Sequence, residues 1–287
     1  MNCDKWDKCT KIIFANGPRG PRGFPGPAGS DGATGPTGPA GTQQGPTGLS
    51  GALATNPYDL FVKAESVGGD GSRQNPYGPI AEGYAAVMPY GTINILEGTY
   101  PLTTQLQIAK DGVTLEGKNG AKIVLQAATI PFLITAKDVT IKNLKITSDV
   151  PYPNEFIQIG GSNAVIKDNE IFGPPQAGDS SGWVVNRGVV AQNGASDFLI
   201  ESNLFYSLRQ PAHFNPSSNG EVLFNTVLNT RGYIVDRASV LFSGNSWGIP
   251  ENAVDIALLS GTQSGAPYDP TAKLSQYNSA ANISDQR

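Results

Sequence analysis

The chain has 287 residues and a formal net charge of −4, and only 15% of its residues are charged, against a usual share of about 25%. No cluster of Lys and Arg lies beyond the first quarter of the chain, which argues against nucleic acid as a partner, because phosphate binding needs a concentrated positive surface. No run approaches the ~20 apolar residues of a membrane span, and the first sixteen residues show no standard secretory signal.

Residues 1–16 are predicted to be a leader that anchors the protein. Both cysteines of the chain lie in it, and their spacing fits no CxxC metal or redox pattern, so no metal site is predicted. The thiols are either free or cross-link the leader to a neighbour. The β-prone run at its end would offer an exposed edge for pairing with a partner, or an apolar plug that aligns three chains. The anchoring residues predicted here are Cys3, Trp6, Cys9, Ile12, Ile13 and Phe14.

Residues 17–53 carry a collagen-like repeat. Glycine occupies every third position from Gly17 to Gly41, in nine consecutive triplets, and resumes at Gly45 after one extra residue, Gln44. Only glycine fits at the axis of three polyproline II chains, so a strict period is a requirement of the triple helix. A flexible Gly/Pro linker would need the composition but not the phase. The segment therefore predicts a short triple-helical stalk and a homotrimer.

The next segment, 54–260, begins with a predicted helix near 79–88. Pro79 suits the first turn of a helix, and Ile80, Tyr84 and Val87 fall on one helical face. A solenoid exposes an apolar end and an unpaired strand edge at its first coil. We therefore expect this amphipathic helix to cap the solenoid that follows.

Short β-prone runs recur through the rest of this segment, at intervals that suit one coil each. Most have Asn in or near the following turn, where Asn tolerates the left-handed backbone of a sharp bend. This cadence predicts an all-β protein made of stacked coils, a parallel β-helix. The alternative is a β-sandwich, but the sequence offers few hairpin turns. Residues 261–287 are predicted to be a C-terminal cap or a tail. The runs begin at residues 113, 139, 164, 198, 222 and 240.

The run from Gly69 to Tyr100 resembles the first segment of the pectate-lyase-like superfamily of right-handed parallel β-helices. It contains an acidic-Gly loop, a capping helix, a Gly-Thr-Ile strand and a Gly-Thr-Tyr turn. The later coils resemble the superfamily in pattern, over about 190 residues. The resemblance implies a right-handed parallel β-helix head, and it brings polysaccharide lyases and hydrolases into consideration by analogy.

The residues themselves predict no catalytic site and no cofactor. The coils lack the paired acids and Gly-His-Gly of a galacturonase-like site, and their scattered acids do not form the cluster that Ca²⁺ would need. Glycoside hydrolysis needs two carboxylates about 5–10 Å apart. Asp168 and Glu170 are candidates, since residues two apart on a strand project to the same side. A solvated outer turn is the simpler interpretation of both.

Carbohydrate contact is predicted on one side of the column. Two insertions, 149–156 and 173–183, lengthen the coils and, with the loop 209–220, line that side; such insertions often build the binding face of a solenoid. Aromatic residues would stack on sugar rings, and charged residues from neighbouring coils would bind an acidic sugar. Ordinary half-exposed aromatics and a surface ion-pair ladder are the alternatives. The candidates are Tyr152, Trp183, Tyr206, Tyr233, Arg209, His213, Arg231, Asp236 and Arg237.

A collagen-like stalk before a globular head, without a secretory signal, resembles the collagen-like surface proteins of Bacillus-type spores. The run "GATGPTGPAG" carries the resemblance. It implies a trimeric fibre on the spore surface, in the exosporium or an appendage. A surface protein would bind the leader, and the head would face outward for adhesion or ligand contact. It also implies O-glycosylation at Thr34, Thr37 and Thr47. The sequence departs from that family in its head, which is expected to be a jelly roll, and in its leader, which lacks a Pro-rich anchoring motif.

Two other functions fit the same sequence. A phage tail fibre or spike also assembles without a secretory signal and combines collagen-like repeats with β-helices. A surface-displayed polysaccharide lyase or hydrolase would use the head as an enzyme.

Overall fold

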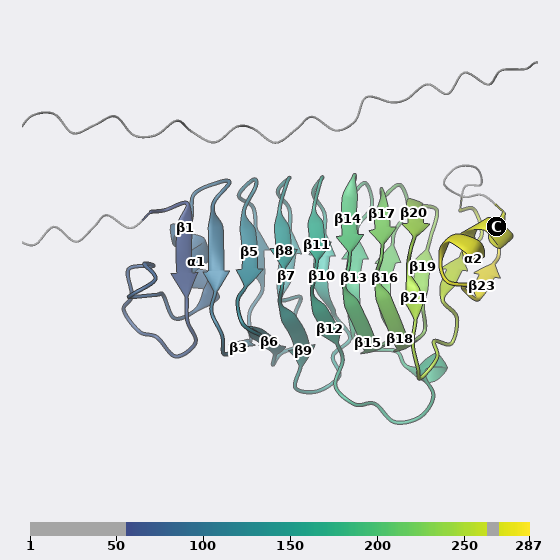
Figure 1. Cartoon of the computed structure of the whole chain (residues 1–287), viewed down its shortest axis with the longest axis horizontal. Helices are drawn as coiled ribbons and strands as arrows, with labels where there is room; N and C mark the ends of the chain where they lie inside the picture. The colour runs from purple at the N-terminus through teal and green to yellow at the C-terminus, as the bar shows by residue number, and fades with distance from the viewer. Residues whose placement is uncertain (1–55, 263–269) are drawn as a thin grey trace, which may run out of the picture. The chain divides into compact units, whose positions relative to one another are not determined.

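The computed structural model describes residues 56–262 and 270–287, which form a parallel β-helix. The chain passes through three sheets in turn and returns to the first, so that each coil contributes one strand to each sheet (Figure 1). Every strand pairing among the described residues is parallel and joins neighbouring coils. The parallel pairing excludes a β-sandwich, which is built from antiparallel strands.

The strands of each sheet follow one another along the column. Sheet A contains β1 (Asp59–Val62), β2 (Thr92–Ile95), β5 (Thr114–Gly117), β8 (Thr140–Lys142), β11 (Val165–Lys167), β14 (Phe198–Glu201), β17 (Asn219–Leu223) and β20 (Ser239–Ser243). Sheet B contains β3 (Thr99–Leu102), β6 (Lys122–Leu125), β9 (Lys145–Ser148), β12 (Glu170–Phe172), β15 (Leu204–Leu208), β18 (Thr226–Thr230) and β21 (Ser246–Trp247). Sheet C contains β4 (Leu106–Ile108), β7 (Phe132–Ile134), β10 (Glu155–Ile159), β13 (Arg187–Ala191), β16 (Gln210–Phe214), β19 (Tyr233–Val235), β22 (Ile256–Leu258) and β23 (Ile283–Asp285).

The core is filled by side chains that repeat at the same register in successive coils. In sheet A, Leu115, Ile141, Ile166 and Ile200 are consecutive register partners, and each is fully buried. Burying an aliphatic side chain of this size contributes about 1.5–3 kcal/mol. Since each coil covers only the coils beside it, this gain depends on stacking, as expected for a solenoid.

Aromatic rings replace part of this aliphatic packing in the C-terminal half of the column. Phe214 stacks on Phe198 with ring centroids 5.3 Å apart, and it also packs against Tyr233 at 6.3 Å. Phe242 meets Phe214 edge to face at 6.0 Å and Tyr233 at 5.4 Å. All four rings are buried, so this cluster fills the interior of the last coils.

Asparagine side chains form a buried ladder at the corner between sheets A and B. Asn203 accepts hydrogen bonds at Oδ1 from the main-chain N–H and the Nδ2 of Asn169, both at 3.0 Å. Its own Nδ2 donates to the carbonyl of Ile166 at 2.8 Å and to Asn225 Oδ1 at 3.0 Å. The same contacts recur in the next coils, through Asn245 and Asn278.

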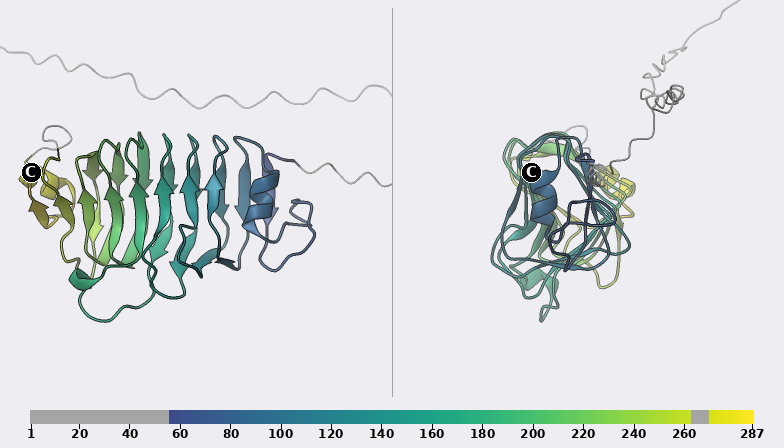
Figure 2. Two further views of the ribbon diagram at one scale, coloured as in Figure 1. Left: turned by 180° about the vertical axis from the view of Figure 1, so that it is seen from behind. Right: turned by 90° about the vertical axis from the view of Figure 1, so that its left-hand side faces the viewer.

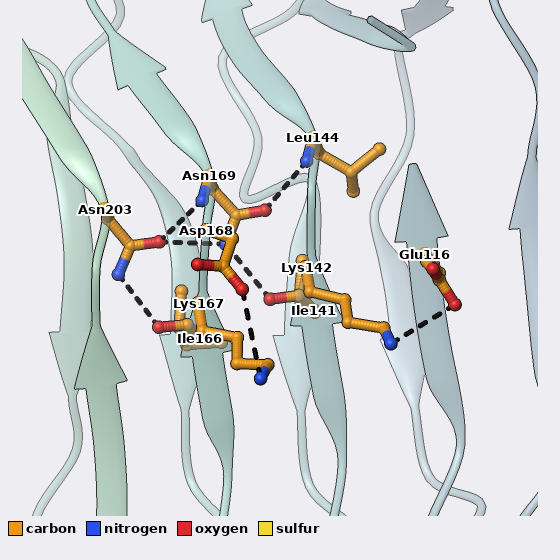
Figure 3. A network of polar contacts seen from close by, with 9 residues as sticks. All are labelled: Glu116, Ile141, Lys142, Leu144, Ile166, Lys167, Asp168, Asn169 and Asn203. Carbon is orange, nitrogen blue, oxygen red and sulfur yellow. Dashed lines mark hydrogen bonds and ion pairs between the residues drawn. The ribbon is translucent and has the colours of Figure 1, made fainter. Parts of the chain in front are cut away.

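The ladder begins at Leu144, whose N–H donates to Asn169 Oδ1 at 3.0 Å (Figure 3). From Leu144 to Asn245, the residue before each ladder position has a positive φ where the chain turns, for example 57° at Asn143, 56° at Asp168 and 55° at Ser202. The predicted Asn-containing turns are therefore present, but the structure shows a second role for Asn. Its carboxamide satisfies main-chain groups that the sharp bend leaves buried without a partner.

The N-terminal end of the column is closed by α1 (Ile80–Ala86), which lies across it in the end-on view (Figure 2). Ile80 and Val87 are buried against the first coil. A Cβ at position 83 would lie 2.6 Å from Val62 Cγ2, so Gly83 allows the helix to approach β1 closely.

A loop covers the free edge of β1. The N–H of Phe61 donates to the carbonyl of Gly71 at 2.9 Å, and the N–H of Lys63 donates to the carbonyl of Tyr77 at 2.8 Å. The N–H of Tyr77 donates in return to the carbonyl of Phe61 at 3.0 Å. The outward-facing main-chain groups of this strand are therefore already hydrogen-bonded.

The C-terminal end is covered by α2 (Thr271–Tyr277) and β23. Leu274 of α2 is buried, and β23 pairs with β22. Asn278, which follows the helix, is the last member of the asparagine ladder. The described part of the predicted C-terminal segment thus packs on the last coil.

Candidate functional site

A long insertion stands out from the column between β12 and β13. Residues 173–186 leave sheet B, pass through the short 3₁₀ helix η1 (Ser180–Gly182) and return to sheet C, below β12, β15 and β18 in Figure 1. A Cβ at position 173 would lie 2.2 Å from the carbonyl oxygen of Ser207, so glycine lets the insertion leave the column beside the next coil. Ser180 Oγ donates to the carbonyl of Thr230 at 2.9 Å, which fastens the insertion across two coils.

Two adjoining hollows, of about 490 Å³ and 470 Å³, lie between this insertion and the column. Gln176, Trp183 and Asn229 line both of them. Small-molecule sites commonly measure about 300–1,000 Å³ and combine aromatic surface with a few polar groups. We call the two hollows together the insertion groove.

An aromatic pair lines the groove on the outer face of sheet B. Phe172 and Tyr206 are register partners in β12 and β15, and their rings are parallel within 4° with centroids 4.8 Å apart. Lys122 Nζ lies 5.8 Å from the Phe172 ring centroid. Rings stacked face to face on neighbouring strands cover each other's faces, so the pair offers the groove an apolar surface of ring edges that a sugar ring can contact.

Hydrogen bonds hold the tyrosine of this pair in place. The Tyr206 hydroxyl donates to Glu170 Oε1 at 2.7 Å, and Lys145 Nζ lies 2.7 Å from Glu170 Oε2. Burial and the Glu170 carboxylate raise the pKa of Tyr206, so its hydroxyl stays protonated. Burial opposes ionisation of Glu170, but the hydrogen bonds from Lys145 and Tyr206 lower the pKa of that carboxyl.

Polar groups surround the aromatic pair. Thr147, Ser148, Asp149 and Ser207 are among the residues that line the first hollow. Asn229 Nδ2 donates to Ser207 Oγ at 3.3 Å. Hydroxyl, carboxamide and carboxylate groups beside an apolar platform are the donors and acceptors that suit the hydroxyl groups of a carbohydrate.

The predicted aromatic residues lie in different environments. Trp183 lines both hollows, although it is largely buried, and its indole N–H donates to the carbonyl of Ala177 at 3.2 Å. Tyr206 belongs to the stacked pair, and Tyr152 is half-buried against the core. Tyr233 is fully buried in the aromatic cluster. Its prediction as an exposed sugar platform is wrong, because it points into the column.

The predicted charged residues form two groups. Arg209 and Arg231 are brought together, since the N–H of Arg231 donates to the carbonyl of Arg209 at 2.8 Å. Arg237 instead pairs with the adjacent Asp236, with Nε 2.8 Å from Oδ1. The only histidine, His213, is half-buried on sheet C. Its pKa is lowered by burial and by Arg187 and Arg209, against the opposing effect of Asp236.

The predicted loop 209–220 is mostly strand. β16 occupies Gln210–Phe214 and β17 begins at Asn219. Pro211 and Pro216 made the sequence look like a loop, because proline cannot donate to a sheet ladder. The flanking pairs Arg187↔Gln210 and Val189↔Ala212 nonetheless continue the sheet around Pro211. His213 therefore projects from a sheet and not from a loop.

Asp168 and Glu170 have separate polar partners. Asp168 is exposed in the turn before Asn169, with Lys167 Nζ 3.9 Å from its Oδ2 (Figure 3). Glu170 is held by Lys145 and Tyr206. Both residues line a shallow hollow of about 440 Å³ in which lysines supply the counter-charges.

Several sequence predictions fall outside the described residues. These are the leader, the collagen-like stalk, the anchoring residues Cys3, Trp6, Cys9, Ile12, Ile13 and Phe14, and the glycosylation candidates Thr34, Thr37 and Thr47. Within residues 56–262 and 270–287, no three His, Cys, Asp or Glu side chains are grouped so that they could hold a metal ion. No helix in the same part of the chain is long and apolar enough to cross a membrane.

Comparison with protein-family models, with curated proteins and with solved structures gives no match for this chain. Its function is therefore inferred from the geometry of its own residues.

Proposed function

We propose that this protein is a trimeric surface fibre whose β-helix head binds carbohydrate in the insertion groove. The observation that carries the proposal is the parallel Phe172–Tyr206 pair, which lines a groove together with Ser, Thr, Asn, Gln and Asp residues. The pair joins two neighbouring coils, and the insertion that begins directly after Phe172 reaches back to the column at later coils, so the complete groove exists only in the folded column. An interior role would have placed these rings in the core, where Phe205 and Phe214 lie.

The rest of the proposal concerns assembly and location. The glycine phase of residues 17–41 supports a triple-helical stalk that joins three chains. The resemblance of the stalk to spore-surface collagens supports a fibre on the spore surface, attached through residues 1–16. A right-handed winding of the head belongs to the same proposal, because connections between parallel strands are right-handed in about 98% of cases.

Tyr206→Ala is expected to weaken oligosaccharide binding by about tenfold or more, because buried aromatic contacts dominate the affinity of most binding sites. Tyr206→Phe keeps the ring and removes only the hydrogen bond to Glu170, so this variant should lose less affinity for the oligosaccharide than Tyr206→Ala. Binding of the full chain to a panel of immobilised neutral and acidic oligosaccharides, followed by titration calorimetry of the tightest, measures both effects.

Tyr277→Ala is the matched control, because Tyr277 is exposed on α2 and does not line the groove. Its binding should equal that of the unaltered chain. Unchanged affinity in Tyr206→Ala, or no binding to any oligosaccharide, would show that the groove is not a carbohydrate site.

The full chain is expected to have about three times the monomer mass of 30.1 kDa, with or without reductant. Gly29→Ser should lower the melting temperature of the stalk, because only glycine fits at the triple-helix axis. Ala28→Ser introduces the same side chain at an outward position and should leave the stalk intact. Light scattering gives the mass, and protease resistance on heating follows the stalk. A monomer under both redox conditions rules out the triple helix.

A further inference from the structure

Three arginines stack in a row at the corner between sheets B and C, one from each of three consecutive coils. Arg187 opens β13, Arg209 lies between β15 and β16, and Arg231 lies between β18 and β19. The N–H of Arg209 donates to the carbonyl of Asn186 at 2.9 Å, and the N–H of Arg231 donates to the carbonyl of Arg209 at 2.8 Å. Arg209 and Arg231 therefore hold equivalent places in neighbouring coils. Arg187 lies one residue further on in its own coil, beside Asn186, and is the register partner of Gln210.

The guanidinium groups make their hydrogen bonds to neutral acceptors. Arg209 Nη1 donates to the carbonyl of Val184 and Arg231 Nη1 to the carbonyl of Trp183, both at 3.0 Å. Because these two carbonyls are adjacent, the Arg209 and Arg231 guanidinium groups converge on one point of the insertion. Arg187 Nε donates to Gln210 Oε1 at 3.0 Å, next to Arg209 in the chain.

No described carboxylate forms an ion pair with any of these three arginines, whereas Arg237 and Arg287 each pair with an aspartate. Glu155 is the register partner of Arg187 in β10, and its single charge leaves the row with an excess of positive charge. Arg209 Nε is buried without a hydrogen-bond partner. Three clustered guanidinium groups repel one another and retain unused donors, an arrangement that an anion would stabilise.

We propose that Arg187, Arg209 and Arg231 form an anion-binding site, and that the carbohydrate bound by this protein is acidic. The inference rests on the proposed function and adds the ligand class to it. The planar fork of arginine suits the carboxylate of a uronic acid and the oxygens of a sulfate or phosphate ester. Trp183 joins the two parts of the site, because its side chain lines the insertion groove while its carbonyl accepts from Arg231.

Binding of the full chain to oligogalacturonate and to maltooligosaccharides of equal length tests the ligand class. The acidic series should bind more tightly, and its affinity should fall as NaCl is raised, because salt screens charge pairs near the surface. Arg231→Met keeps the apolar stem and removes the charge, and we expect it to weaken oligogalacturonate binding by about tenfold. Arg73→Met removes the same charge at an exposed position on the N-terminal loop and should have no effect.

The outcomes separate this inference from the proposed function. If Tyr206→Ala loses binding while the unaltered chain binds neutral and acidic sugars equally, the groove remains the carbohydrate site and the anion site is overturned. Loss in Arg231→Met without loss in Tyr206→Ala would support the anion site and overturn the groove. If Arg231→Met unfolds the insertion, the salt titration on the unaltered chain decides, since salt-independent binding overturns the site.

His213 offers a second readout, which does not depend on any variant. Its neighbours at the same register, Val190 and Ile234, are uncharged, so the charges that act on it are those of Arg187, Arg209 and Asp236. An anion bound to the arginines would offset their repulsion and raise the pKa of His213. A pH titration of the labelled imidazole should show this rise with trigalacturonate and not with maltotriose. The same titration of His213 with inorganic sulfate and with inorganic phosphate, each added separately, shows which of these anions also binds. An unchanged pKa with all three anions overturns the site.

Discussion

Asn203→Ala is expected to lower the free energy of unfolding by about 3–5 kcal/mol, although it removes no charge and little apolar surface. The substitution deletes four hydrogen bonds at once. It leaves the N–H of Asn169 and the carbonyl of Ile166 without these partners in a buried corner, and an unsatisfied buried group costs about 1–3 kcal/mol. Chemical denaturation of the full chain gives the total loss. Hydrogen exchange should show that the loss of protection is concentrated in the coils that contain β11, β14 and β17.

Gln126→Ala is the matched control for the ladder. It also deletes a carboxamide, but Gln126 is exposed at the end of β6, at the corner between sheets B and C. Surface substitutions usually change stability by less than about 0.5 kcal/mol. Equal stability of the Asn203 and Gln126 variants would mean that water replaces the ladder contacts.

Phe214→Ala is expected to lower the free energy of unfolding by about 3–5 kcal/mol through the cavity that it leaves. Phe214 is fully buried and contacts the rings of Phe198, Tyr233 and Phe242. Loss of the central ring should also loosen the other three, so the near-ultraviolet circular dichroism of the native state should weaken. Denaturation followed by fluorescence and by circular dichroism measures both effects.

Phe224→Ala removes the same phenyl ring from the surface of the same half of the column. Phe224 is 58% exposed, and its φ of 54° places it in the turn before Asn225. We expect a change of less than about 1 kcal/mol. A loss as large as that of Phe214→Ala would show that the aromatic cluster is not the main support of the last coils.

The sequence located sheet A well, for a physical reason. Each predicted run overlaps a strand of that sheet, and the run that starts at residue 222 begins inside β17. The sheet A strands in these runs alternate buried and outward residues, which gives the period of two expected of a strand. They end near the ladder corner, where the Asn residues of the left-handed turns mark the end of the strand in the sequence. Sheets B and C were not located strand by strand. In β10 of sheet C the consecutive residues Phe156 and Ile157 are both buried, which removes the alternation that marks a strand in the sequence.

The site was harder to predict than the fold. Arg209 and Arg231 were correctly placed side by side from the coil period, but Arg187 was missed. Its spacing of 22 residues to Arg209 equals that from Arg209 to Arg231, so the same coil period could have identified it. Phe172 was missed for a physical reason, because its pairing with Tyr206 spans the 173–186 insertion, which lengthens the coil. Tyr233 was wrongly chosen because an inward and an outward tyrosine look alike in a short strand.

The covered edge of β1 also limits how copies of the head can associate. The free edge of a sheet is a ready template for another strand, and unprotected edges lead to amyloid-like growth. Here a further strand would first have to displace the loop that bonds to Phe61 and Lys63. Strand addition to sheet A at this end of the column is therefore opposed, and association there would first have to use β3 or β4, which are the edge strands of the other two sheets.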